Sequence, residues 1–168
     1  QIDYLSNIAS DFSSFANIGN PRLQEVNVVE SIRSVVGLFS MQEEGLIELT
    51  TETDELIVMA DKTQLNRLFT NLIRNALEAV PAETEARVQL FIEQEHEHVL
   101  IRITDNGGGV KPELQDKIFY PNFTTKTSGT GLGLAMCKGI VEQMKGDIWF
   151  TTEQEKGSTF FVELPLLS

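Results

Sequence analysis

The segment between Asp61 and Pro81 carries the most regular hydrophobic pattern in this chain. Its apolar residues recur at three- and four-residue steps, the spacing of one face of an α-helix: Leu65, Leu68, Phe69, Leu72, Ile73, Ala76, Leu77 and Val80. Asp61 followed by Gln64 is typical of an N-cap and its capping-box partner. We therefore predict a helix that starts after Asp61, ends before Pro81 and turns its apolar face to the core.

Segments with strand-like composition occur on both sides of the Asp61 helix. They cover residues 46–50, 56–60, 86–93, 98–104, 148–152 and 159–164. The first two are predicted to form a hairpin across an acidic turn, and the next two a hairpin across a turn rich in Glu and His. Helical spacing predicts further helices over residues 28–41, 113–118 and 132–144. Because the strands outnumber the faces that a lone sheet can bury, the helices from Asp61 and Leu132 are expected to cover one side of the sheet.

The start of the chain carries another helical stripe. Apolar residues keep helical spacing over residues 2–16, and the sequence Ile-Gly-Asn-Pro at 18–21 then breaks the helix. We place a domain boundary there, between residues 1–19 and residues 20–168. The first segment is either an ordinary core helix or the end of a helical hairpin or dimer bundle whose remainder lies upstream.

The composition limits what this chain can bind. With 13 basic and 25 acidic residues it has a formal net charge of −12, which argues against a general nucleic-acid or anionic-membrane surface, because such surfaces need clustered Lys and Arg. No apolar run reaches the roughly 18 residues that span a bilayer, so we expect no direct membrane contact. Cys137 is the only cysteine, so a reducing, cytoplasmic location is the simpler interpretation.

Two glycine clusters indicate a close approach of backbone to a phosphate or a flat ring, because glycine lacks a Cβ and permits positive φ. Residues 105–110 follow a predicted strand, and residues 129–134 precede a predicted helix. Pro112 stands where a dinucleotide fingerprint has its third glycine, and neither cluster has P-loop spacing. The sequence therefore excludes the usual Rossmann and P-loop sites, whereas the second cluster leads a helix N-terminus that favours an anion.

Asn71 and Asn75 lie one helical turn apart and outside the apolar stripe, so both carboxamides are expected on one face of the helix. Two Asn residues are a poor choice for helix propensity alone. Either they are buried amides that satisfy loop backbone, or their oxygens bind a hard cation such as Mg²⁺, which takes its other ligands from water and substrate phosphates.

Four ordered segments carry a family resemblance. They are Asn71-Leu-Ile-Arg-Asn75-Ala-Leu-Glu-Ala, Asp105-Asn-Gly-Gly-Gly109, Ile118-Phe-Tyr-Pro-Asn-Phe-Thr-Thr-Lys126 and Gly129-Thr-Gly-Leu-Gly133-Leu. In order and spacing they resemble the N box, first glycine box, F box and second glycine box of sensor histidine kinase catalytic domains. Gly157-Ser-Thr159 fits the last glycine motif of that family. The resemblance covers about residues 26–164. The residues within these motifs are most similar to those of nitrogen-regulation-like two-component sensor kinases.

The resemblance implies an α/β (α+β) fold, a two-layer Bergerat-type sandwich in which helices cover one face of a mixed β-sheet and a helix precedes it. It also implies binding of ATP and Mg²⁺. Asp105 would accept a hydrogen bond from the adenine amino group, and Gly107 and Gly109 would let the backbone approach the ring. Asn75 would hold the Mg²⁺, with Asn71 supporting the metal or its waters.

The same resemblance assigns the phosphate end of the site. Lys126 would meet the γ-phosphate as a point charge. The segment after it would fold over the nucleotide as a lid. Its cofactor-binding residues would be Gly129, Thr130, Gly131, Leu132 and Gly133. Phe119 and Phe123 would anchor this lid to the core.

Asn71 stands where gyrase-, chaperone- and mismatch-repair-type ATPases resembling this chain carry a Glu as general base. An amide does not take a proton from water at neutral pH. The domain is therefore expected to hold ATP and to pass its γ-phosphoryl to another acceptor, with Asn71, Asn75 and Lys126 as the catalytic residues.

The phosphoacceptor His of the family is not found in this chain, because His96-Glu97 imitates the motif but falls in a predicted turn. We expect a fragment of a sensor histidine kinase that autophosphorylates a His outside it, dimerises through the absent helical hairpin and passes the phosphate to the receiver domain of a response regulator. A Ser/Thr kinase of the same GHKL superfamily, a GHKL ATPase and a non-catalytic nucleotide-binding module remain alternatives. The amphipathic segment before Pro21 favours the histidine kinase. The sequence leaves open whether the full-length protein is membrane-anchored.

Overall fold

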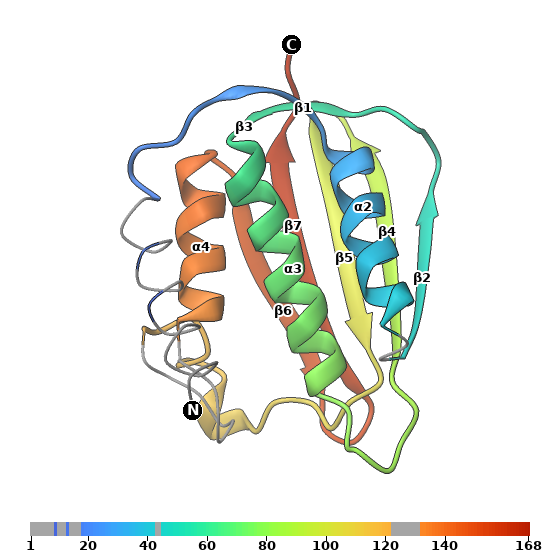
Figure 1. Ribbon diagram of the computed structural model, residues 1–168. Coiled ribbons are helices and arrows are strands. Elements are labelled where there is room, and N and C mark those ends of the chain that lie inside the picture. The colour runs from blue at the N-terminus through green and yellow to red at the C-terminus, as the bar shows by residue number, and fades with distance from the viewer. Residues whose placement is uncertain (1–8, 10–12, 14–17, 43–44, 122–131) are drawn as a thin grey trace.

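The computed structural model describes residues 9, 13, 18–42, 45–121 and 132–168. Their elements, in chain order, are β1 (Gln24–Asn27), α2 (Val28–Met41), β2 (Leu46–Thr51), β3 (Ile57–Ala60), α3 (Lys62–Glu78), β4 (Arg87–Glu95), β5 (His98–Asp105), the 3₁₀ helix η1 (Pro112–Leu114), α4 (Gly133–Gln143), β6 (Asp147–Glu153) and β7 (Gly157–Pro165). Helices α2, α3 and α4 cover one face of a five-stranded sheet (Figure 1). The predicted two-layer α/β architecture is confirmed.

The sheet is mixed, as predicted, with the strand order β2-β4-β5-β7-β6. β2 runs parallel to β4, and the other three pairs are antiparallel. The predicted hairpin of β4 and β5 is confirmed, and its turn contains His96 in the left-handed region with φ 55°. The predicted final strands pair as β6 and β7. The helix predicted over residues 113–118 is wrong: a 3₁₀ helix of three residues, Pro112–Leu114, stands there and is followed by a turn, because the backbone hydrogen bonds reach back three residues and not four.

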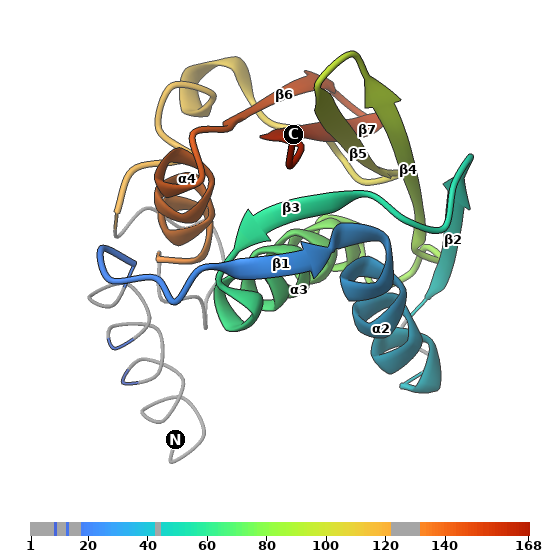
Figure 2. The ribbon, with the colours of Figure 1, turned by 90° about the horizontal axis from the view of Figure 1, so that it is seen from above.

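The predicted hairpin between residues 46–50 and 56–60 is wrong. β2 pairs with β4, and β3 pairs antiparallel with β1, a short strand that the sequence analysis missed. Figure 2 shows β1 and β3 side by side at the end of the molecule where α2 begins. The side chain of Asn27 explains the difference, because its Oδ1 accepts the N–H of Leu56 at 3.1 Å and its Nδ2 donates to the carbonyl of Asp54 at 2.9 Å. These bonds hold the segment after β2 against the start of α2 instead of in a tight turn.

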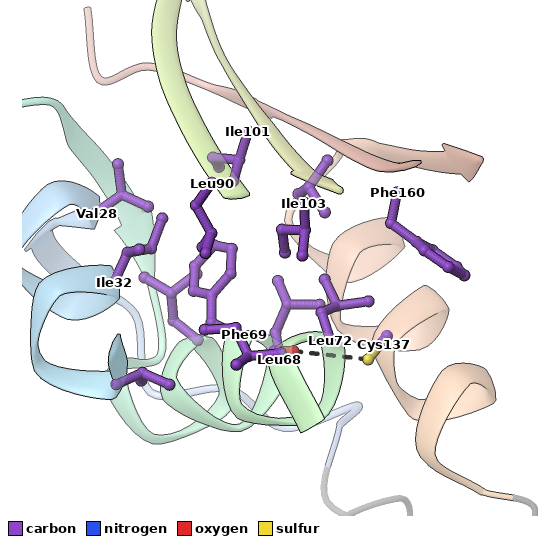
Figure 3. Packing of buried hydrophobic residues seen from close by; sticks show 14 of the residues in the cluster. Val28, Ile32, Leu68, Phe69, Leu72, Leu90, Ile101, Ile103, Cys137 and Phe160 are labelled. Atoms are coloured by element: carbon purple, nitrogen blue, oxygen red, sulfur yellow. Dashed lines mark hydrogen bonds between the residues drawn. The ribbon is translucent and has the colours of Figure 1, made fainter. Parts of the chain in front are cut away.

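The core lies between the helices and the sheet, and α3 is its centre. All seven apolar residues of the predicted stripe that lie within α3 are buried, and so is Val80 beyond its end. Figure 3 shows Leu68 and Leu72 of α3 facing Cys137 of α4. The Cys137 thiol donates to the carbonyl of Leu68 at 3.8 Å, and burial raises its pKa. Cys137 is thus a small buried residue of the core, as expected from its neighbours on the helix.

Residues 1–8, 10–12 and 14–17, which carry most of the predicted N-terminal helix, lie outside the described residues. Residues 18–20 form a turn, and Ile18 is buried against Gly139 of α4, where an added Cβ would lie 3.2 Å from the Ile18 side chain. The division into residues 1–19 and 20–168 stays a prediction. Among the described residues, no helix has the length and apolar character that crossing a bilayer requires.

Asp61 fixes the start of α3, as its place in the sequence predicts. Its Oδ1 accepts the N–H of Gln64 at 3.1 Å, and its Oδ2 accepts the N–H of Arg22 at 2.9 Å. Burial works to raise the pKa of Asp61, but hydrogen bonds from the N–H groups of Arg22, Gln64 and Thr63 outweigh it and hold the pKa below its ordinary value. One carboxylate therefore caps the central helix and ties the segment before β1 to it.

Replacing Asp61 with Ala should lower the free energy of unfolding by about 0.5–2 kcal/mol, because both N–H groups lose their acceptor. Asp61→Asn keeps one side-chain oxygen that can cap the helix, so its free energy of unfolding should fall by less than that of Asp61→Ala. Since the folded-state pKa is lowered, this stabilisation is present above the unfolded pKa of about 3.9 and is lost as the pH falls through the folded value. Urea denaturation at pH 7 and at pH 3 measures these differences, and equal stability of Asp61→Ala and the parent at pH 7 would contradict the cap.

Candidate functional site

The predicted site residues that the structure describes gather at one end of the sandwich, the lower end in Figure 1. α3 and β5 end there, and β7 and α4 begin there. The turn that holds His96 precedes the other end of β5, because this strand runs from His98 to Asp105. His96 is therefore a residue of an exposed turn, as expected, and lies a whole strand away from the candidate site.

Asp105 is the one acidic side chain buried in the described part of this end, with 4% of its surface exposed. Its Oδ1 accepts the N–H of Gly107 at 2.8 Å and the N–H of Ser158 at 3.3 Å. Its Oδ2 is buried and has no hydrogen-bond partner among the described residues. Burial raises the pKa of Asp105, although the two N–H groups stabilise the charged form. The site thus presents a fixed carboxylate with one oxygen left to accept a hydrogen bond.

Gly107 and Gly109 pack the loop after β5 against neighbouring backbone. A Cβ at Gly107 would overlap the carbonyl of Ala79 at the end of α3. Gly109 has φ +78°, and its Cβ would lie 2.6 Å from the carbonyl oxygen of Glu153. The predicted role of these glycines in admitting a nucleotide ring stays a prediction, but their small size already has a structural cause in these contacts.

The start of β7 contributes two residues that the sequence analysis did not place in the site. Gly157 has φ +127°, and a Cβ there would overlap the carbonyl of Asp105. Ser158, which follows it, is buried and donates its N–H to Asp105. The signal in the sequence was the Gly-Ser-Thr motif after a turn, but only the pairing of β7 with β5 brings it beside Asp105.

Asn71 and Asn75 lie one turn apart on α3, and both side chains are half-buried. The Nδ2 of Asn71 is buried without a hydrogen-bond partner among the described residues. Among all the residues that the structure describes, no group of three or more His, Cys, Asp or Glu side chains could hold a metal ion. A cation here would therefore depend on amide oxygens and on ligands from a substrate, which is a donor set that suits Mg²⁺.

The structure describes only part of the predicted lid. Lys126, Gly129, Thr130 and Gly131 lie outside the described residues, and so does Phe123. Leu132 is buried and precedes α4, and Gly133 is the first residue of that helix. A Cβ at Gly133 would meet no described atom within 4 Å, so its predicted role in binding stays a prediction.

Phe119 anchors the chain before that segment to the sheet, as predicted. Its ring lies edge-on to Phe150 and Phe160, with centroids 6.1 and 6.3 Å apart. Lys138 of α4 places its ammonium group 5.9 Å from the centre of the same ring. These contacts join the start of the lid region to β6, β7 and α4.

Two cavities of the described residues differ in what lines them. The larger, of about 500 Å³, lies near the start of α3 beside Asp61 and includes no predicted site residue. The smaller, of about 320 Å³, is lined by Asp105 and Ser158 together with residues of β6 and its following turn. Of the predicted site residues that the structure describes, only Asp105 lines either of these cavities. We therefore place the candidate site by the Asp105 carboxylate and not by cavity size.

Comparison with known proteins agrees with this geometry. Residues 60–168 match the family described as "Histidine kinase-, DNA gyrase B-, and HSP90-like ATPase". The chain belongs to this family.

Several sensor kinases are similar to this chain. Sensor histidine kinase ZraS of Salmonella typhimurium is 32% identical over 171 residues, which cover 100% of this chain and 37% of ZraS. The catalytic domain of histidine kinase ThkA superposes with a TM-score of 0.76 at 33% identity, over 86% of this chain and 95% of that domain. ThkA in complex with response regulator TrrA gives 0.79 at 28% identity, over 99% of this chain and 49% of that one. Full-length ShkA in complex with AMPPNP gives 0.84 at 26% identity, over 99% of this chain and 36% of that one.

Gly107 and Gly108 form a matched pair for testing the loop. We expect Gly107→Ala to lower the free energy of unfolding by about 1–3 kcal/mol, because its Cβ must displace the backbone of Ala79. Gly108→Ala, whose Cβ meets nothing within 4 Å, should change it by no more than about 0.5 kcal/mol. Urea denaturation of both variants measures the difference, and equal losses would contradict the backbone packing described above.

Proposed function

We propose that this chain is the ATP-binding catalytic domain of a sensor histidine kinase. The observation that carries the proposal is the carboxylate of Asp105, whose Oδ1 is held by two backbone N–H groups while its buried Oδ2 has no described partner. The amino group of adenine donates hydrogen bonds and suits this oxygen, whereas guanine offers a carbonyl at that position, which a carboxylate repels. The complex of ShkA with AMPPNP, an ATP analogue, supports the same class of ligand.

The phosphates of ATP would extend from Asp105 toward α3 and the start of α4. Asn75 would contribute an amide oxygen to Mg²⁺, which neutralises charge on the phosphates. Asn71 has a buried amide nitrogen without a described partner, and this group can donate to a phosphate oxygen or to a water on the metal. Lys126 and the glycines at 129, 131 and 133 would complete the phosphate side, with Thr130 and Leu132 in the same segment.

The reaction in this proposal is transfer of the γ-phosphoryl to a His outside the chain. Asn71 stands in the place of a general base, and its amide cannot activate water, so positioned ATP is kept for a protein acceptor. The exposed turn with His96 lies at the other end of β5 and is not that acceptor. The similarity to ThkA in complex with a response regulator supports a receiver domain as a partner. The proposal also includes a helical hairpin outside this chain that would carry the acceptor His and through which the whole protein would dimerise.

Asp105→Asn tests the adenine assignment. The amide keeps an oxygen for Gly107 and Ser158 but replaces the free acceptor by a donor, and hydrogen bonds to charged groups contribute about 1.5–3 kcal/mol. ATP should bind roughly 10- to 150-fold more weakly, as measured by calorimetry. The parent should also lose affinity as the pH falls through the raised pKa of Asp105, because the protonated acid is a poorer acceptor, and the variant should not.

The same variant should fold at least as stably as the parent at pH 7. The folded-state pKa of Asp105 is raised, so its charged form opposes folding above that pKa and this cost is relieved as the pH falls through it. Asparagine removes the buried charge at any pH. A variant that binds ATP as tightly as the parent would overturn the assignment, and one that loses binding only by unfolding would melt at a lower temperature.

Asn75→Ala tests the metal and transfer roles. It should lose most of the Mg²⁺ dependence of ATP binding and most of the transfer of labelled phosphate to a separate fragment that carries a helical His-Glu hairpin. Asn66→Ala is the matched control, because Asn66 also carries a half-buried carboxamide on α3, about 2.5 turns away. Steady phosphate release without labelling of the hairpin would favour an ATPase, and unchanged Mg²⁺ dependence in Asn75→Ala would place the metal elsewhere.

A further inference from the structure

Thr152 of β6 lies in the candidate site, although the sequence analysis gave it no role. It pairs with Ser158 of β7, and both side chains lie on the face of the sheet that carries Asp105. The side chain of Thr152 is half-buried and helps to line the cavity of about 320 Å³.

The hydroxyl of Thr152 joins the loop after β5 to the start of β7. Its Oγ1 accepts the N–H of Val110 at 2.8 Å and lies 2.8 Å from the Oγ of Ser158. A third, longer contact of 3.4 Å connects it to the carbonyl of Gly157. A hydroxyl has one proton to donate and two lone pairs to accept with. The Thr152 hydroxyl can therefore make all three contacts, and its methyl group takes part in none of them.

These contacts hold both ends of the loop from Gly107 to Val110. Gly107 donates to Oδ1 of Asp105 at 2.8 Å, and Val110 donates to Thr152. The N–H of Glu155 donates to the carbonyl of Gly108 at 2.8 Å and holds the middle of the loop. Ser158 completes the connection, because its hydroxyl contacts Thr152 and its N–H contacts Asp105.

We propose that Thr152 is a positioning residue for nucleotide binding: its hydroxyl holds Val110 and Ser158 so that the loop beside Asp105 is ordered before the base arrives. This inference rests on the proposed function, since it deepens the role of the same site. Thr152 acts through Val110, Ser158 and Asp105 and does not itself contact the nucleotide. A site that is already ordered binds more tightly, because less freedom is lost on binding.

Thr152→Val tests this role with little change in shape, because valine replaces the hydroxyl by a methyl group. It should weaken binding of both ATP and ADP by about tenfold, since the loop beside the base is affected and the phosphate side is not. The Mg²⁺ dependence should stay as in the parent. Thr152→Ser restores the hydroxyl and should bind within about twofold of the parent. Thr50→Val is the matched control, because Thr50 is an exposed strand residue of β2, far from the site.

Amide hydrogen exchange of the nucleotide-free protein gives a second measurement. The Val110 and Gly107 amides should exchange faster in Thr152→Val than in the parent, and Thr152→Ser should restore the slower exchange. Should the valine variant not fold, Thr152→Ala repeats both measurements with the hydroxyl removed and no new methyl group.

Three outcomes would overturn the inference: unchanged nucleotide affinity in Thr152→Val, equal weakening in Thr152→Ser and Thr152→Val, or unchanged exchange of the Val110 amide. Failure of the proposed function is distinct from these, since the parent itself would then bind neither ATP nor ADP. In that case the exchange measurement still decides whether the Thr152 hydroxyl orders the loop.

Discussion

The carboxylate of Asp105 is buried at the end of β5, and a buried ionised group is costly unless hydrogen bonds replace the lost water. The structure offsets this cost with two backbone N–H groups, one from the loop that follows Asp105 and one from β7. Both donors come close only because the backbone is tightly packed, with Gly107 against Ala79 and Gly157 against Asp105 itself. Gly107 and Gly157 therefore permit the close backbone packing that brings these two donors to the carboxylate.

Helix α3 connects this support to the hydrophobic core. One of its faces is buried against the sheet and the neighbouring helices, while Asn71 and Asn75 lie half-buried outside that apolar face. Its last turn leads to Ala79, whose carbonyl accepts the N–H of Gly108 at 3.4 Å. Packing of the core thus sets the position of the loop beside Asp105 and of the amide pair at the same time.

The proposed ligand is a polyanion, whereas the chain has a formal net charge of −12. These two facts are compatible if charge is neutralised locally. A helix N-terminus at α4, a divalent cation on amide oxygens and one Lys can hold phosphates without a basic surface. The acidic remainder of the surface then discourages nucleic acids and other large polyanions from competing at the site.

Local patterns in the sequence determined helices α2, α3 and α4, the Asp61 cap and the β4–β5 and β6–β7 hairpins, because each depends on residues a few positions apart. The parallel pairing of β2 with β4 and the antiparallel pairing of β3 with β1 escaped prediction because Asn27 binds residues 54 and 56 across a long separation in the chain. The resemblance of the motifs identified Asp105 and the two asparagines from the sequence. Only the tertiary structure brought Gly157, Ser158 and Thr152 beside Asp105, because strand pairing, which no single segment encodes, decides which strands meet that carboxylate.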